Sequence, residues 1–72
     1  MSQWISVKTR LPEEAQEVLV YVERTSRLNT LYHYMLIAYI DEGEWSTDKH
    51  TYVYGEEIYW RHLPQTPEGK EE

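Results

Sequence analysis

The chain has 72 residues, a formal net charge of −6 at pH 7 and no cysteine. This length allows one domain, because a second core could not bury enough surface. The acidic balance argues against direct binding of duplex nucleic acid or of an anionic membrane surface. Without cysteine there is no disulfide, no thiolate metal site and no cysteine nucleophile.

The first part of the chain predicts two strands. Residues 4–7 alternate in polarity, as in a short strand that ends at Leu11-Pro12, because proline removes a backbone donor. Residues 12–16 begin with proline and two acids, a pattern that allows one helical turn at most. Residues 17–23 predict the clearest strand, in which the β-branched valines fall on one face and Leu19 and Tyr21 on the other.

A longer strand is predicted over residues 32–41. Apolar side chains fall on both of its faces, which indicates either a central strand or a second surface covered by a partner. A helical period is also present, but the Tyr and Ile content and the turn that follows favour a strand. Residues 41–44 predict that turn, since Gly43 can adopt the positive φ of a tight hairpin.

The rest of the chain predicts shorter strands. Residues 45–47 begin the returning strand, residues 51–54 alternate again after a polar break, and residues 58–63 form the last strand before Pro64. The sequence therefore predicts an all-β fold: one small antiparallel sheet or partly open barrel of four to five strands over residues 1–64. We expect residues 65–72 to form a flexible acidic tail.

Three blocks of sequence, in order along the chain, resemble domain-of-unknown-function family 551. The blocks are Trp4-Ile-Ser-Val-Lys8 with Arg10-Leu-Pro12 and Glu17-Val-Leu-Val20; Ile37-Ala-Tyr39 with Asp41-Glu-Gly-Glu-Trp45; and Tyr59-Trp60 with Leu63-Pro64 and Pro67. The resemblance implies a setting in temperate phages and prophages of bacteria. It implies no activity and transfers no catalytic residue. The polar segments 24–30 and 46–55 are longer than in a minimal member, so specificity could lie there.

Each block holds one tryptophan, at positions 4, 45 and 60. We expect the three rings to pack together as the core of the sheet. The alternative is an aromatic pocket for a planar ligand such as a nucleotide.

Seven tyrosines without any phenylalanine favour half-buried surfaces, since every such ring keeps a polar hydroxyl. The clustered acids are either ordinary solvated side chains of hairpins, or they imitate the phosphates of a nucleic acid. We predict a protein-binding surface made of these side chains: Tyr32, Tyr34, Tyr52, Tyr54, Asp41, Glu42, Glu44, Asp48, Glu56 and Glu57.

The sequence predicts no metal, no cofactor and no catalysis. His33, His50 and His62 lack ligand spacing, although a zinc site made by His50, His62 and a carboxylate stays open. The acidic loop 41–48 lacks the ligand pattern of an EF-hand. There is no glycine-rich phosphate loop and no nucleophile motif, and a chain of this length leaves little room for a substrate cleft.

These observations predict a non-catalytic phage or prophage accessory protein that binds a host or phage protein, for example to inhibit a host defence system. The alternative is an oligomeric protein that sequesters a nucleotide between aromatic rings, beside Arg24, Arg27 or Arg61. A homo-oligomer fits both readings. The N-terminus lacks the pattern of a signal peptide, and the most apolar window, residues 34–40, is far shorter than the ~20 residues of a spanning helix. We therefore expect a cytoplasmic protein in a bacterial host cell.

Overall fold

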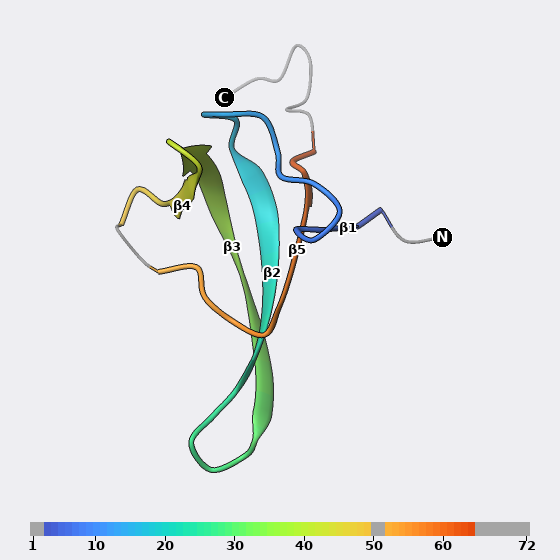
Figure 1. Cartoon of the computed structure of the whole chain (residues 1–72), viewed down its shortest axis with the longest axis vertical. Helices are drawn as coiled ribbons and strands as arrows, with labels where there is room; N and C mark the ends of the chain where they lie inside the picture. Colours follow the sequence, from blue (N-terminus) through green and yellow to red (C-terminus); the bar gives the residue numbers. More distant parts are fainter. Residues whose placement is uncertain (1–2, 50–51, 65–72) are drawn as a thin grey trace, which may run out of the picture.

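The computed structural model of the chain describes residues 3–49 and 52–64. Five strands make one sheet: β1 (Ile5–Ser6), β2 (Val18–Thr25), β3 (Leu31–Asp41), β4 (Glu44–Ser46) and β5 (Glu57–His62). All strand pairs are antiparallel, and the order across the sheet is β1-β5-β2-β3-β4 (Figure 1). The described residues contain no helix. The all-β prediction is confirmed, and the predicted tail 65–72 lies outside the described residues.

Strands β2 and β3 form the long hairpin that dominates the sheet. They pair from Val18 opposite Ala38 to Thr25 opposite Leu31, and β5 pairs with the other side of β2. The β-branched and aromatic content of both segments suits a pleated, half-buried surface. Both predicted strands are therefore correct, and each extends further toward the hairpin tip than the sequence pattern indicated.

Strand β3 has neighbours on both sides only at one end. It pairs with β2 over eight residues, but β4 pairs with it only at Tyr39, Ile40 and Asp41. The prediction of a central strand therefore fails for most of β3. From Leu31 to Ala38 this strand lies at an edge of the sheet. The other interpretation of the sequence, a second surface covered by a partner, stays a prediction.

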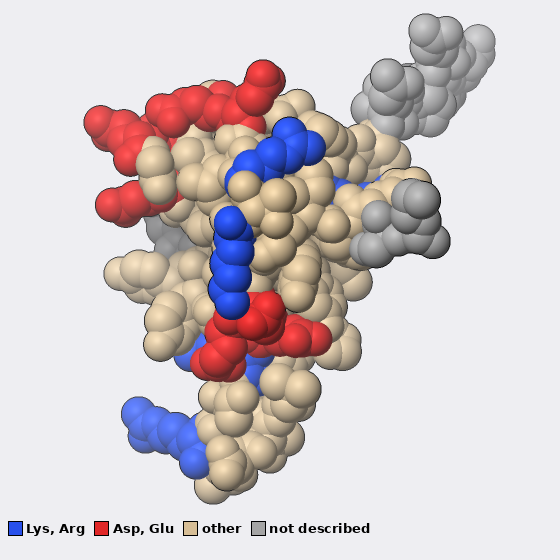
Figure 2. All heavy atoms as spheres, turned by 45° about the vertical axis from the view of Figure 1, so that its right-hand side comes forward, with Lys and Arg blue, Asp and Glu red and all other residues tan. Residues whose placement is uncertain are grey.

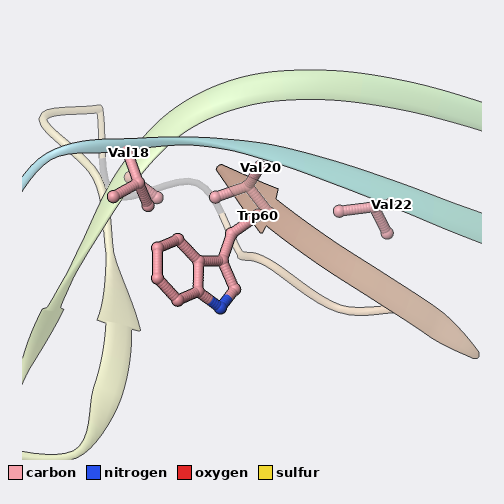
Figure 3. Close-up of a cluster of buried hydrophobic side chains, with 5 residues drawn as sticks. Val18, Val20, Val22 and Trp60 are labelled. Atoms are coloured by element: carbon pink, nitrogen blue, oxygen red, sulfur yellow. The ribbon is translucent and has the colours of Figure 1, made fainter. Parts of the chain in front are cut away.

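The core lies on one face of the sheet. Val18, Val20 and Val22 point to the same side of β2 and are fully buried, with the ring of Trp60 beneath them (Figure 3). The indole N–H of Trp60 donates a hydrogen bond of 2.9 Å to the carbonyl oxygen of Arg10. This bond ties the segment before β2 to the core face and satisfies the single polar group of the largest buried side chain.

The three tryptophans do not share one core. Trp60 is buried and Trp45 is half-buried against the same cluster. The Trp4 ring instead lies 5.8 Å from the ring of Tyr21, whose side chain is on the opposite face from the valines. The prediction of a three-tryptophan core is therefore wrong for Trp4. Ile5, its neighbour in sequence, packs toward the core, and alternation sends Trp4 to the other side.

Two predicted local elements differ from the structure. The segment 12–16 is no helical turn: Ala15 has a φ of 67° and its N–H donates to the carbonyl of Ile40 at 2.8 Å. The Gln16 N–H donates to the Glu13 carbonyl at 3.2 Å, so the segment forms a β-turn that a long-range backbone bond joins to β3. Residues 52–55 form no strand; Val53 packs on the core and Gly55 approaches β2 closely. Thr51 lies outside the described residues.

The turn between β3 and β4 has the predicted hairpin geometry. Glu42 and Gly43 have φ angles of 53° and 83°, and Asp41 pairs with Glu44. Two positive φ angles in a two-residue loop define a type I′ turn, for which Asn-Gly is the preferred pair. Glu42 is therefore in a conformation that costs a side chain other than Asn or Gly about 1 kcal/mol.

Replacing Glu42 by asparagine is expected to raise the free energy of unfolding by about 0.5–1 kcal/mol, because asparagine tolerates the left-handed conformation better. Urea unfolding measures the change. Glu44→Asn is the matched control, since it removes the same charge from β4, where the backbone is extended. An equal gain in both variants would assign the effect to charge and contradict the conformational explanation.

Candidate functional site

The face of the sheet opposite the core carries a continuous group of large side chains. Alternation along β2, β3 and β5 places them there, and Trp4 joins them from the segment before β1. We call this surface the open face; its main residues are Trp4, Leu19, Tyr21, Glu23, His33, Met35, Ile37, Tyr39, Glu57, Tyr59 and Arg61. Met35 and Ile37 are 57% and 52% exposed. The described segments that pack against the core, such as Val7 and Val53, lie on the other side.

Tyr21 is the centre of an aromatic cluster on the open face. Its ring centroid lies 5.8 Å from Trp4, 5.5 Å from His33 and 6.3 Å from Tyr59. The guanidinium of Arg61 lies over the Trp4 ring at 5.8 Å from its centroid. Tilted and offset ring pairs at these separations are favourable contacts, so the cluster is a preformed and ordered surface.

Two carboxylates border this cluster. The Tyr21 hydroxyl donates to Glu23 at 2.7 Å, and the Tyr59 hydroxyl donates to Glu57 at 3.1 Å. Glu23 and Glu57 are opposite each other in the register, an arrangement that destabilises a sheet unless the charges are offset. The hydrogen bonds from the two phenols reduce the repulsion between the carboxylates. Lys8 reduces it further, since its ammonium lies 3.5 Å from Glu57.

The same hydrogen bonds change the titration of both phenols. Donation to Glu23 is the main cause that raises the pKa of Tyr21 above 10.0, and donation to Glu57 does the same to the pKa of Tyr59. A phenol must keep its proton to donate, and a tyrosinate beside a carboxylate would be repelled.

Alkaline pH is therefore expected to destabilise the fold. In the unfolded chain these phenols ionise near a pKa of about 10, below their folded pKa, so their contribution to the free energy of unfolding is complete below that pH and decreases above it. Urea unfolding at several pH values measures the decline, and tyrosinate absorbance identifies the two late-titrating phenols. Tyr21→Phe should make the decline shallower. An unchanged slope in that variant would contradict the assignment.

A cavity of about 570 Å³ lies at one side of the open face, between β3 and the segment that follows β4. Its lining residues are Glu17, Leu19, Met35, Leu36, Ile37, Tyr39, Thr47, Asp48 and Lys49. The lining contains one aromatic ring and no arginine. This composition differs from the arginine-flanked aromatic sandwich that the nucleotide-binding alternative requires.

Three of the six predicted acidic residues lie together at one end of the sheet. Asp41, Glu42 and Glu44 belong to the β3–β4 hairpin, and the backbone N–H of Glu42 donates to the carboxylate of Glu14 at 3.1 Å. Acidic side chains cover this end in Figure 2. Lys or Arg side chains lie at the tip of the β2–β3 hairpin and also along the middle of the molecule, where a second group of acids lies. Asp48 lies two residues after the end of β4 and lines the cavity.

Three of the predicted tyrosines lie near the other end of β3, on the core side: Tyr32 and Tyr34 of β3, and Tyr54 of the connection before β5. The Tyr34 hydroxyl donates to the carbonyl of Tyr54 at 3.5 Å, and the guanidinium of Arg24 lies 4.7 Å from the centroid of the Tyr54 ring. Tyr32 is opposite Arg24 in the register. Tyr32 and Asp41 are nine residues apart along one strand, which corresponds to roughly 30 Å. The acidic turn and these tyrosines are therefore separate surfaces.

The remaining predicted residues are divided among these regions. The Glu56 carboxylate accepts a hydrogen bond of 2.7 Å from the backbone N–H of Thr25, near the Tyr54 side. Glu57 borders the open face, and Tyr52, in the connection before β5, is 89% exposed.

Sequence reasoning did not select the aromatic side chains of the open face. Trp4, Tyr21 and Tyr59 are absent from the predicted surface. Alternation nevertheless places Tyr21 and Tyr59 on the face of the sheet opposite their buried sequence neighbours, Val20 and Trp60. The usable signal was the set of large side chains that remain after one face of each strand is assigned to the core.

Within residues 3–49 and 52–64, no three His, Asp or Glu side chains are placed to hold a metal ion, and His50 lies outside these ranges. Over the same ranges no helix has the length and apolar character needed to cross a membrane.

A family model described as a protein of unknown function, DUF551, matches residues 3–68. This range covers most of the 72 residues. The chain belongs to this family. Searches of curated proteins and of solved structures found no match.

The DUF551 assignment confirms the resemblance that the three sequence blocks indicated. In the structure these blocks supply β1, the start of β2, the β3–β4 turn and the tryptophan of β5. Because the family description gives no activity, a functional assignment for this DUF551 chain depends on the geometry of its surfaces.

Proposed function

We propose that this DUF551 chain is a non-catalytic phage or prophage accessory protein that binds another protein through the open face. The observation that carries the proposal is the ordered aromatic cluster around Tyr21, with exposed Met35 and Ile37 beside it. Aromatic and methionine side chains are enriched at protein interfaces, and charged side chains are depleted from interface centres. Here the charges of Glu57 and Arg61 border the aromatic centre.

The acidic end of the sheet supports a role for charge in the same interaction. The net charge of −6 and the cluster formed by Asp41, Glu42 and Glu44 would attract a basic partner, and complementary charge mainly raises the association rate. Host proteins that handle nucleic acids have such basic surfaces. Inhibition of a host defence system is therefore one form of the proposed function, and the phage setting that the family resemblance implies agrees with it.

The test is affinity purification of the tagged chain from a bacterial host, with identification of the captured proteins and measurement of the affinity of each. Trp4→Ala is expected to lower the affinity for a specific partner by about 30-fold, because the loss of an interface hot spot costs about 2 kcal/mol of binding free energy. Tyr52→Ala is the control, because it removes an exposed aromatic ring from the connection before β5, outside the open face. Equal affinities of Trp4→Ala and wild type would refute the open-face assignment.

Charge variants separate the two contributions. Glu42→Lys combined with Glu44→Lys should slow association and reduce its dependence on salt, with a small effect on dissociation.

A nucleotide that raises the melting temperature of the chain in a ligand panel would instead support sequestration, since a ligand of the native state raises apparent stability.

A further inference from the structure

The edge of β3 from Leu31 to Ala38 is unusual for a protein that stays a monomer. This segment, Leu-Tyr-His-Tyr-Met-Leu-Ile-Ala, contains no Lys, Arg, Asp, Glu, Pro or Gly. Edge strands are normally protected against pairing by charges, prolines, bulges or short length. Four large apolar side chains are exposed along it: Leu31 at 65%, Tyr32 at 39%, Met35 at 57% and Ile37 at 52%.

The backbone groups that face outward along this edge belong to alternate residues. The type I′ turn makes Asp41 and Glu44 a hydrogen-bonded pair, so the odd-numbered residues of β3 direct their N–H and C=O toward the β4 side. The Ile40 carbonyl agrees, since it accepts from Ala15 on the opposite side. Among the described residues, the backbone groups of Leu31, His33, Met35 and Ile37 therefore have no strand partner on that side.

We propose that this edge pairs with the same edge of a second copy of the chain, in antiparallel orientation about a two-fold axis. One register uses all four outward-facing residues: Leu31 is opposite the partner's Ile37, His33 opposite the partner's Met35, and Tyr34 opposite the partner's Tyr34. Shifting the strands by two residues in either direction leaves at least one of the four unpaired. The segment after β4 lies on the same side of β3 and lines the cavity with Met35 and Ile37, so in this register the partner's Leu31 must occupy that cavity.

Side chains match in this register on both faces. On the open face, Leu31 meets the partner's Ile37, and Met35 meets the partner's His33. On the core side, Tyr32 meets the partner's Leu36, and the two copies of Tyr34 are neighbours at the axis. The pairing buries the exposed apolar side chains of the edge, and apolar or aromatic cross-strand pairs stabilise a sheet.

Charge is also complementary despite the net charge of −6. The acids Asp41, Glu42 and Glu44 lie at one end of β3, and the exposed Arg27 lies in the loop at the other end. Antiparallel pairing directs the acidic end of each copy toward the basic loop of the other, twice by symmetry. The open faces of both copies then lie on the same side of one continuous sheet.

The first measurement is the mass of the purified wild-type chain in solution by light scattering or sedimentation. We expect a concentration-dependent species of twice the chain mass of 8.7 kDa. Met35→Pro should give the monomer, because proline removes an outward N–H and leaves the β2–β3 bonds in place. Met35→Ala, which keeps that N–H, is the matched control and should still dimerise. A wild-type chain that stays monomeric at its highest soluble concentration overturns the proposal.

The register has its own test, which the absence of cysteine from the chain makes clean. Tyr34→Cys should form a disulfide between chains on mild oxidation, because residues at the axis have Cα atoms about 4.5 Å apart, within disulfide range. Tyr32→Cys should not, since its counterpart is about 13 Å away along the paired strands. Equal cross-linking of the two variants contradicts the register. Both measurements use the purified chain alone, so their outcome is independent of the proposed protein partner.

Discussion

Replacing Trp60 by alanine is expected to lower the free energy of unfolding by about 3–5 kcal/mol, the usual cost of truncating a large buried aromatic side chain. Trp60 is 1% exposed and is the largest fully buried side chain among the described residues. A domain of 72 residues is stable by about 4–11 kcal/mol. The variant should therefore lose a large part of its stability and melt at a much lower temperature, which thermal unfolding followed by circular dichroism measures.

Two further variants separate the sources of this effect. Trp60→Phe keeps most of the ring but leaves the Arg10 carbonyl without its donor, so we expect a smaller loss of about 1–2 kcal/mol. Trp4→Ala removes an equally large ring from the open face, away from the valine core, and should cost about 1–2 kcal/mol. If Trp4→Ala were as damaging as Trp60→Ala, the division into a core face and an open face would be wrong.

The strands were predictable from the sequence because alternation is a local property. Val18, Val20 and Val22 are buried, and the side chains between them point away, as a period of two requires. The β3–β4 turn was predictable for a similar reason, since Gly43 has the positive φ that the hairpin needs. Each of these inferences depends only on residues that are adjacent in the chain.

The failed predictions depend on contacts between distant segments. Proline and acids at 12–16 are compatible with a helical turn, but Ala15 bonds to Ile40, which is 25 positions away. The order of strands in the sheet also depends on contacts between distant segments. The local pattern of β3 does not reveal it, because apolar side chains on both faces fit a central strand and an edge strand equally well. The predicted surface residues do not lie together, because composition counts tyrosines and acids without their positions, whereas strand length separates Tyr32 from Asp41.

Replacing Gly55 by alanine is expected to lower the free energy of unfolding by about 2–3 kcal/mol, because the added methyl group has no space. An ideal Cβ at this position would lie 2.5 Å from Cγ1 of Val22, 2.7 Å from the carbonyl oxygen of Glu23 and 2.9 Å from Cγ of Arg24. The Glu23 carbonyl also accepts the N–H of Glu56 at 3.0 Å, so the backbone is fixed on both sides of the contact. Urea unfolding measures the loss.

Gly43→Ala is the matched control for Gly55, because a Cβ at Gly43 would meet no atom within 4 Å and only its φ of +83° opposes the substitution. A double-mutant cycle then isolates the clash. Val22→Ala removes one of the atoms that the new methyl group would meet, so Gly55→Ala should cost less in that background, with a coupling of at least about 0.5 kcal/mol. Additive losses would mean that the close approach to Val22 does not limit this position. A coupling of the expected sign would show that the chain crosses the core face here only because residue 55 has no side chain.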